Sequence, residues 1–143
     1  MANYQCALRT NYFRVKDEEK FKSFMKNVYG TNGDPIVWEE TFDGVKRFGF
    51  GCYGAIAGLK ITCCDDDEEE TCYDAFIDGL QELVADDDAI IIYESGHEAL
   101  RYVTGMAEVI TATDYSGINL INAAENLAET MLNIPGWETK SEY

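Results

Sequence analysis

The dipeptide Asp43-Gly44 constrains the fold most tightly. It lies between two strand-like runs, and Asp-Gly is the preferred two-residue turn between antiparallel strands. In the register that this turn imposes, Glu40 faces Arg47, an opposite-charge pair across the two strands. The sequence therefore predicts a β-hairpin here and, with it, an antiparallel sheet.

Three segments have the apolar spacing of amphipathic helices. The first follows Asp17, a plausible N-cap, and stops at Gly30. The second begins at Thr71 as N-cap, and the third begins at Asp114 or Ser116. The residues predicted to face the core are Phe21, Phe24, Met25 and Val28; then Tyr73, Phe76, Ile77, Leu80 and Val84; then Leu120, Ala124, Leu127 and Met131, with Ile121 and Ala128 beside them.

The remaining apolar runs read as strands. The run 4–15 is strand-like with a break near Asn11, and 89–95 reads as a buried strand that ends at a turn, Gly96-His97. A long strand follows the turn. The order is β-α-β-β-α-β-β-α, which predicts an α+β fold: a largely antiparallel sheet of about five strands, packed with three helices on one face. We expect one domain over 1–143, with an exposed acidic loop around 63–71.

Composition supports a folded domain. The chain has 143 residues, of which 46% are apolar and 13% aromatic, enough to build a core. No apolar run is long enough for a membrane span, and the first residues do not resemble a secretory signal. Five cysteines, an odd number, are typical of reduced thiols. We therefore expect a cytoplasmic protein, without metal or cofactor.

Charge is distributed unevenly along the chain. Residues 1–60 carry nine basic and seven acidic side chains, whereas residues 61–143 carry two basic and twenty acidic ones, giving −16 in total. Direct binding to nucleic acid needs a basic footprint, and an anionic membrane surface would repel the second half. The pattern excludes both and favours a basic protein as partner.

The acidic residues near the second helix form the predicted partner-binding surface. Asp74, Asp78 and Glu82 recur every four residues, so they share one side of the helix. The whole predicted surface is Asp65, Asp66, Asp67, Glu68, Glu69, Glu70, Asp74, Asp78, Glu82, Asp86, Asp87 and Asp88. Its rows of negative charge could imitate a nucleic-acid backbone. The alternative is a solvated face that only keeps the protein soluble.

Catalytic motifs are scarce in this sequence. It contains neither a nucleophile elbow nor a phosphate-binding glycine loop, and we predict no catalytic residue. A possible secondary site combines Glu94, His97, Glu98 and Arg101, which could act in acid–base chemistry or bind a small ligand. The simpler interpretation is hydrogen bonding around a turn.

Three stretches carry a resemblance to a known group. RTNYFRVKDEEKF (9–21), FGFGCYG (48–54) and YESGHEALRYVTGMAEVIT (93–111) resemble small acidic accessory proteins encoded on plasmids, conjugative elements and phages of Gram-positive gut bacteria. The resemblance implies a setting, because such elements carry anti-CRISPR and anti-restriction proteins, several of which are acidic mimics of DNA. It implies no enzymatic activity.

Charge and resemblance together predict a non-enzymatic inhibitor of a host defence nuclease. Its partner would be a basic nucleic-acid-binding protein, such as a Cas effector or a restriction enzyme. A small interaction or regulatory module of a mobile element, with aromatic rather than acidic contacts, is the alternative. The sequence leaves the oligomeric state open.

Overall fold

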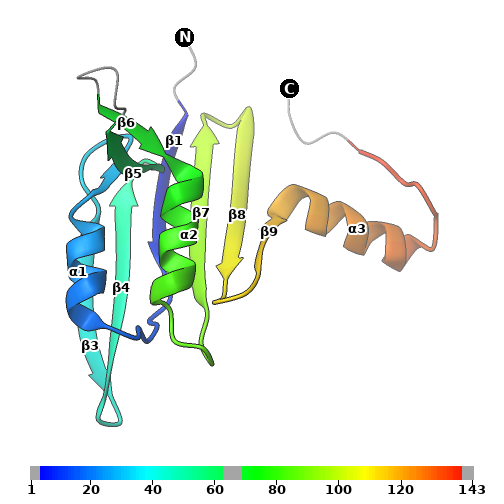
Figure 1. Ribbon diagram of the computed structural model, residues 1–143. Coiled ribbons are helices and arrows are strands. Elements are labelled where there is room, and N and C mark those ends of the chain that lie inside the picture. Colours follow the sequence, from blue (N-terminus) through cyan, green and yellow to red (C-terminus); the bar gives the residue numbers. More distant parts are fainter. Residues whose placement is uncertain (1–3, 63–68, 140–143) are drawn as a thin grey trace.

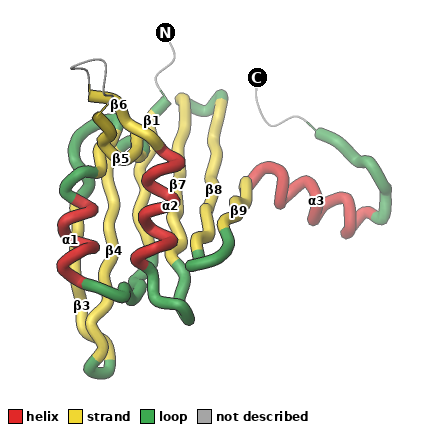
Figure 2. The backbone as a smooth tube through the Cα atoms, viewed as in Figure 1, coloured by secondary structure: helices red, strands yellow, loops and turns green. Residues whose placement is uncertain are grey.

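The structure is a computed structural model that describes residues 4–62 and 69–139. Within these ranges it is an α+β fold with three helices and nine strands in two antiparallel sheets (Figures 1 and 2). The main sheet has the order β3-β4-β1-β7-β8-β9, and the small sheet has the order β2-β5-β6. The predicted class is confirmed, but about five strands in one sheet, and the order built on them, were wrong.

The elements follow one another in this order: β1 Gln5–Thr10, α1 Glu18–Met25, β2 Val28–Gly30, β3 Ile36–Phe42, β4 Val45–Tyr53, β5 Ile56–Thr62, β6 Glu69–Cys72, α2 Tyr73–Leu83, β7 Ile90–Glu98, β8 Tyr102–Ile110, β9 Tyr115–Asn119 and α3 Leu120–Leu132.

The hairpin is confirmed in detail. β3 and β4 pair with Phe42 opposite Val45 and Glu40 opposite Arg47, as the sequence predicts. Asp43 and Gly44 both have positive φ, 51° and 79°, which is the geometry of a type I′ turn. The turn therefore sets the register of the strand pair.

Helices α1 and α2 cover one face of the main sheet, and an aromatic core lies between (Figure 1). Phe13, Phe21, Phe50 and Phe76 are all completely buried. Their rings pack mostly edge to face, with centroids 5.6–6.1 Å apart, a favourable arrangement for aromatic pairs. The core is therefore built from large side chains of both helices and the central strands.

The first two helices begin and end close to where the sequence places them. Asp17 is confirmed as the N-cap of α1 and accepts a hydrogen bond from the Lys20 amide, 3.1 Å away. The helix ends at Met25 rather than at Gly30, because Val28–Gly30 pairs with β5 as β2. The N-cap of α2 is Cys72 rather than Thr71, and Thr71 lies in β6.

Two expectations in the second half were wrong. Gly96-His97 is not a turn but lies inside β7, and the chain turns after Glu98, where Ala99 has positive φ. Asp114 and Ser116 do not begin the last helix. Residues Tyr115–Asn119 form β9 on the edge of the main sheet, and Asn119 caps α3 with hydrogen bonds from Ile121 and Asn122.

The other face of the main sheet carries no helix (Figure 1). We define the open face by the outward side chains of its central strands: Gln5, Ala7 and Arg9 of β1; Ile91, Tyr93, Ser95 and His97 of β7; and Val103, Gly105, Ala107 and Val109 of β8. Helix α3 leaves the sheet beyond β9 and projects away from it, and none of its residues is buried. The prediction that all three helices pack on one face is therefore wrong for α3.

Candidate functional site

The acidic stripe of α2 is placed as the sequence predicts. Asp74, Asp78 and Glu82 are exposed, while Phe76 and Leu80 on the opposite side are fully buried. Successive members of the stripe are about 6 Å apart along the helix axis. In the described parts of the chain, no salt bridge joins these three carboxylates to a cation. The stripe therefore keeps its negative charge on the surface.

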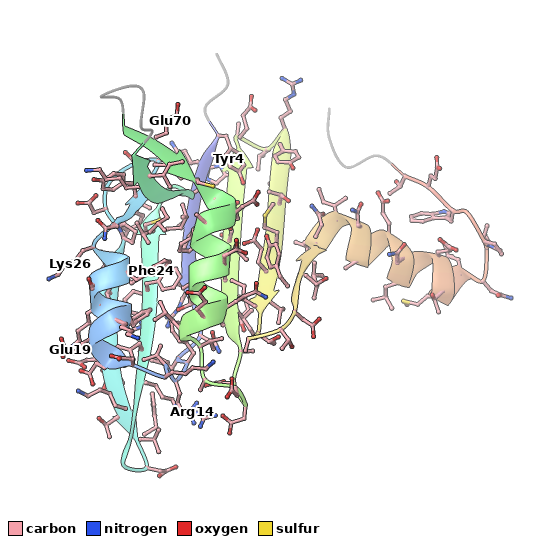
Figure 3. The ribbon with its side chains drawn as sticks, in the orientation of Figure 1. Tyr4, Arg14, Glu19, Phe24, Lys26 and Glu70 are labelled. Atoms are coloured by element: carbon pink, nitrogen blue, oxygen red, sulfur yellow. The ribbon has the colours of Figure 1, made fainter. Side chains whose placement is uncertain are left out.

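The acidic run before α2 is described only in part. Asp65, Asp66, Asp67 and Glu68 lie outside the described residues. Glu69 and Glu70 belong to β6, where Glu70 lies opposite Ile61 of β5, so residues 69–71 of the loop expected around 63–71 form a strand instead. Glu70 is exposed near the end at which α2 begins (Figure 3).

The three aspartates after α2 lie against basic side chains of the first half. Asp86 pairs with Lys16 at 3.0 Å and Asp87 with Arg14 at 2.8 Å. The side chain of Asp88 is only 17% exposed; it accepts a hydrogen bond from the Arg14 amide at 2.8 Å, and the Arg14 and Arg47 guanidinium groups lie 3.4 and 3.8 Å away.

These contacts form a cluster of three carboxylates and three cations below the end of α2, where Figure 3 shows Arg14. Its charges cancel locally, so the cluster offers less negative potential than the sequence suggests. No local pattern in the sequence indicates this pairing, since the partners are more than 35 residues apart. Whether Asp86, Asp87 and Asp88 bind a partner stays a prediction.

A half-buried acidic group, Glu94 and Glu108, lies between α2 and the sheet, and sequence analysis missed it. The Tyr73 hydroxyl donates a hydrogen bond to the Glu108 carboxylate, and Glu94 lines the same cavity, of about 180 Å³, together with Leu8, Ile56 and Ile92. Burial and the Glu108 carboxylate raise the pKa of Tyr73 well above its usual range.

Burial also raises the pKa of Glu94, and the neighbouring Glu108 carboxylate adds to the effect. Residues 94 and 108 lie on different strands, but each stands between two residues of the open face. Because side chains alternate along a strand, this position could have placed both on the covered side. The cavity is small and most of its lining residues are apolar, so these groups belong to the packing between α2 and the sheet.

The predicted secondary site does not come together. Glu94 and His97 are three residues apart on β7, so their side chains lie on opposite faces of the sheet. Glu94 lies opposite Met106 on the covered side, whereas His97 is exposed on the open face opposite Val103. Arg101 is exposed in the turn between β7 and β8, and Glu98 ends β7.

Metal ligands do not gather in the part of the chain that the structure describes. No group of three His, Cys, Asp or Glu side chains there is close enough to hold an ion. Among the described cysteines, Cys72 caps the N-terminus of α2, where its Sγ accepts a hydrogen bond from the Ala75 amide at 3.4 Å.

Comparison with known proteins gives no relative. No family model, no curated protein and no solved structure matches the chain. Over the described residues, no helix is both long and apolar enough to cross a membrane.

Proposed function

We propose that this chain is a non-enzymatic inhibitor that binds a basic nucleic-acid-handling protein, such as a Cas effector or a restriction enzyme. Its contact surface is the acidic stripe of α2, Asp74, Asp78 and Glu82, continued by the acidic run before it. The observation that carries the proposal is the exposure of three carboxylates on one side of a helix, with no cation paired to them in the described residues.

The stripe has an energetic cost that a purely solubilising surface need not have. Like charges four residues apart in a helix destabilise it by roughly 0.2–0.5 kcal/mol per pair. The stripe contains two such pairs, Asp74 with Asp78 and Asp78 with Glu82. Elsewhere the chain does pair its helical charges, as Glu18 and Lys22 do at 2.9 Å in α1. A basic partner would remove the repulsion in the stripe.

The density of charge bears on what the stripe imitates. One DNA strand presents a phosphate about every 3.4 Å of helix axis. The stripe presents a carboxylate about every 6 Å, which is roughly half that density. The stripe alone is therefore a sparse imitation, and the proposal assigns the acidic run at 65–70 to the same contact. The aspartates after α2 are assigned a smaller part, because they are paired internally.

A triple variant, D74N/D78N/E82N, tests the proposal. Binding to the partner should weaken strongly and lose most of its dependence on salt, since screened charge pairs carry the contact. The matched control is D86N/D87N together with E138Q, which removes the same number of charges from outside the stripe. Equal binding by the two triple variants would contradict the proposal.

An interaction module with apolar contacts is a second candidate. It is favoured by the bare face of the main sheet and by the exposed apolar side of α3. Binding that persists at high salt and survives the stripe variant would favour this candidate over the first.

A further inference from the structure

Helix α3 has an apolar stripe that the described chain leaves largely exposed. Leu120, Leu127 and Met131 share one side of the helix, and they are 56%, 60% and 78% exposed. On the adjacent side, Trp137 of the following segment lines a pocket of about 330 Å³ together with Ile121 and Ala128. An exposed apolar stripe on an amphipathic helix is typical of a docking surface.

The same chain has a bare surface of matching character, the open face. Tyr93 and Val103 are about half exposed there, and Ala7, Ser95 and Gly105 lie side by side across three neighbouring strands. None of these three positions has a large side chain, which leaves room for a helix to approach the sheet closely. Leu120 of α3 already lies against Gly105, at one end of this row.

The dimensions of the two surfaces agree. Helix α3 has 13 residues and is therefore about 20 Å long. Neighbouring strands are about 4.8 Å apart, so a helix of this length laid across the sheet spans about five strands. The main sheet has six.

The charges of the arm and of the open face are also complementary. The described arm, Leu120–Thr139, carries three glutamates and no basic residue. The open face carries Arg9, which lies over the Tyr12 and Trp38 rings, and none of its defining residues is acidic. In a chain of net charge −16, this face is therefore suited to receive a second acidic copy.

The arm cannot easily cover the sheet of its own chain. Asn119 is both the last residue of β9 and the N-cap of α3, so no linker separates strand from helix. Its side chain accepts hydrogen bonds from the Ile121 amide at 2.9 Å and the Asn122 amide at 3.3 Å, which fix the direction of the helix. That direction leads away from the sheet (Figure 1). Folding back would break this cap.

We propose that two copies of this chain form a dimer by exchanging arms, with α3 of each copy lying across the open face of the other. Such an arrangement has two-fold symmetry, and in each copy it buries both the apolar stripe of α3 and the open face. It is independent of the proposed function, because the acidic stripe of α2 lies on the covered side of the sheet.

Light scattering coupled to size exclusion tests the dimer. The wild-type chain should have twice the 16.1 kDa mass of one copy. L127D on the arm and Y93D on the open face should each be monomeric, while N126D, which adds the same charge on the polar side of α3, should remain a dimer. Circular dichroism on each variant checks that it folds.

Mixing the two monomeric variants makes the test specific. Their heterodimer has one intact contact, the arm of the Y93D chain on the open face of the L127D chain, so a fraction of the mixture should dimerise. A dimer that survives Y93D would point to pairing of arm with arm and overturn the exchange, as would a wild-type monomer at all concentrations.

Discussion

Replacing the central carboxylate of the stripe, Asp78→Lys, should stabilise the fold while it weakens partner binding. The substitution turns two repulsive i,i+4 pairs, with Asp74 and Glu82, into two attractive ones. At roughly 0.2–0.5 kcal/mol for each repulsion lost and each attraction gained, the free energy of unfolding should rise by about 1–2 kcal/mol. Lysine also has a better helix propensity than aspartate, by a few tenths of a kcal/mol.

The assay is thermal and urea unfolding at equal protein concentration, at low and at high salt. For a chain of this length, 1 kcal/mol corresponds to a rise in melting temperature of about 2–4 °C. The gain should shrink at high salt, because both pairs are exposed and therefore screened. E138K, with the same charge change outside the stripe, should leave stability nearly unchanged. An unchanged or lower stability of Asp78→Lys at low salt would refute the reasoning.

Three further predictions concern Phe76 in the core and the half-buried acidic group around Tyr73 and Glu94. Phe76→Ala should lower the free energy of unfolding by about 3–5 kcal/mol in urea titrations, because the ring is fully buried against Phe24, Phe50 and Tyr73; a loss under about 1 kcal/mol would contradict this packing. The raised pKa of Tyr73 means that folding favours the neutral phenol, so its stabilisation is complete below the ordinary tyrosine pKa of about 10 and is lost as pH rises beyond it. Alkaline absorbance titration should therefore show a phenolate that forms later than those of the other tyrosines, and Tyr73→Phe should remove it; an unaltered titration curve would contradict this. The pKa of Glu94 is also raised, so its charged form opposes folding above the ordinary glutamate pKa of about 4.3. Glu94→Gln should therefore stabilise the protein at pH 7 but not at pH 4. Equal effects at both pH values would exclude charge as the cause.

The sequence predicts the hairpin, the start of α1 and the apolar side of α2, because each depends on residues close together in the chain. Asp43-Gly44 accepts positive φ at both positions, which sets the register of β3 and β4 without help from the rest of the chain. The Asp17 cap and the apolar side of α2 are likewise properties of neighbouring residues. Such elements are predictable because their causes lie within a few positions.

The missed elements depend on contacts between distant segments. Strands β2, β6 and β9 have three to five residues, too few to show alternation, and β2 and β6 are recognised only by their pairing with β5. Gly96 suggested a turn but serves packing instead, because the Tyr4 ring occupies the space of a side chain at that position. The ring contact joins residues that are far apart in the sequence, so it leaves no local signature.

The candidate site divides in the same way: local spacing predicted one part, and long-range contacts determine the rest. The stripe on α2 follows from helical spacing alone, and the structure exposes it as expected. The pairing of Asp86, Asp87 and Asp88 with Arg14, Lys16 and Arg47 does not, because it needs the strands to bring the two halves of the chain together. The apolar pattern of α3 was visible, but the sequence could not show that the helix leaves its own core.

Capture of partners from a bacterial lysate, with wild-type chain and D74N/D78N/E82N side by side at low and high salt, tests the proposed function most directly. Any protein identified by mass spectrometry would then be assayed for DNA binding with and without the chain. We expect a basic nucleic-acid-binding protein that the wild type holds at low salt and releases at high salt. The stripe variant should not capture it, and the wild-type chain should displace it from DNA. A partner held equally by both chains at both salt concentrations would contradict it.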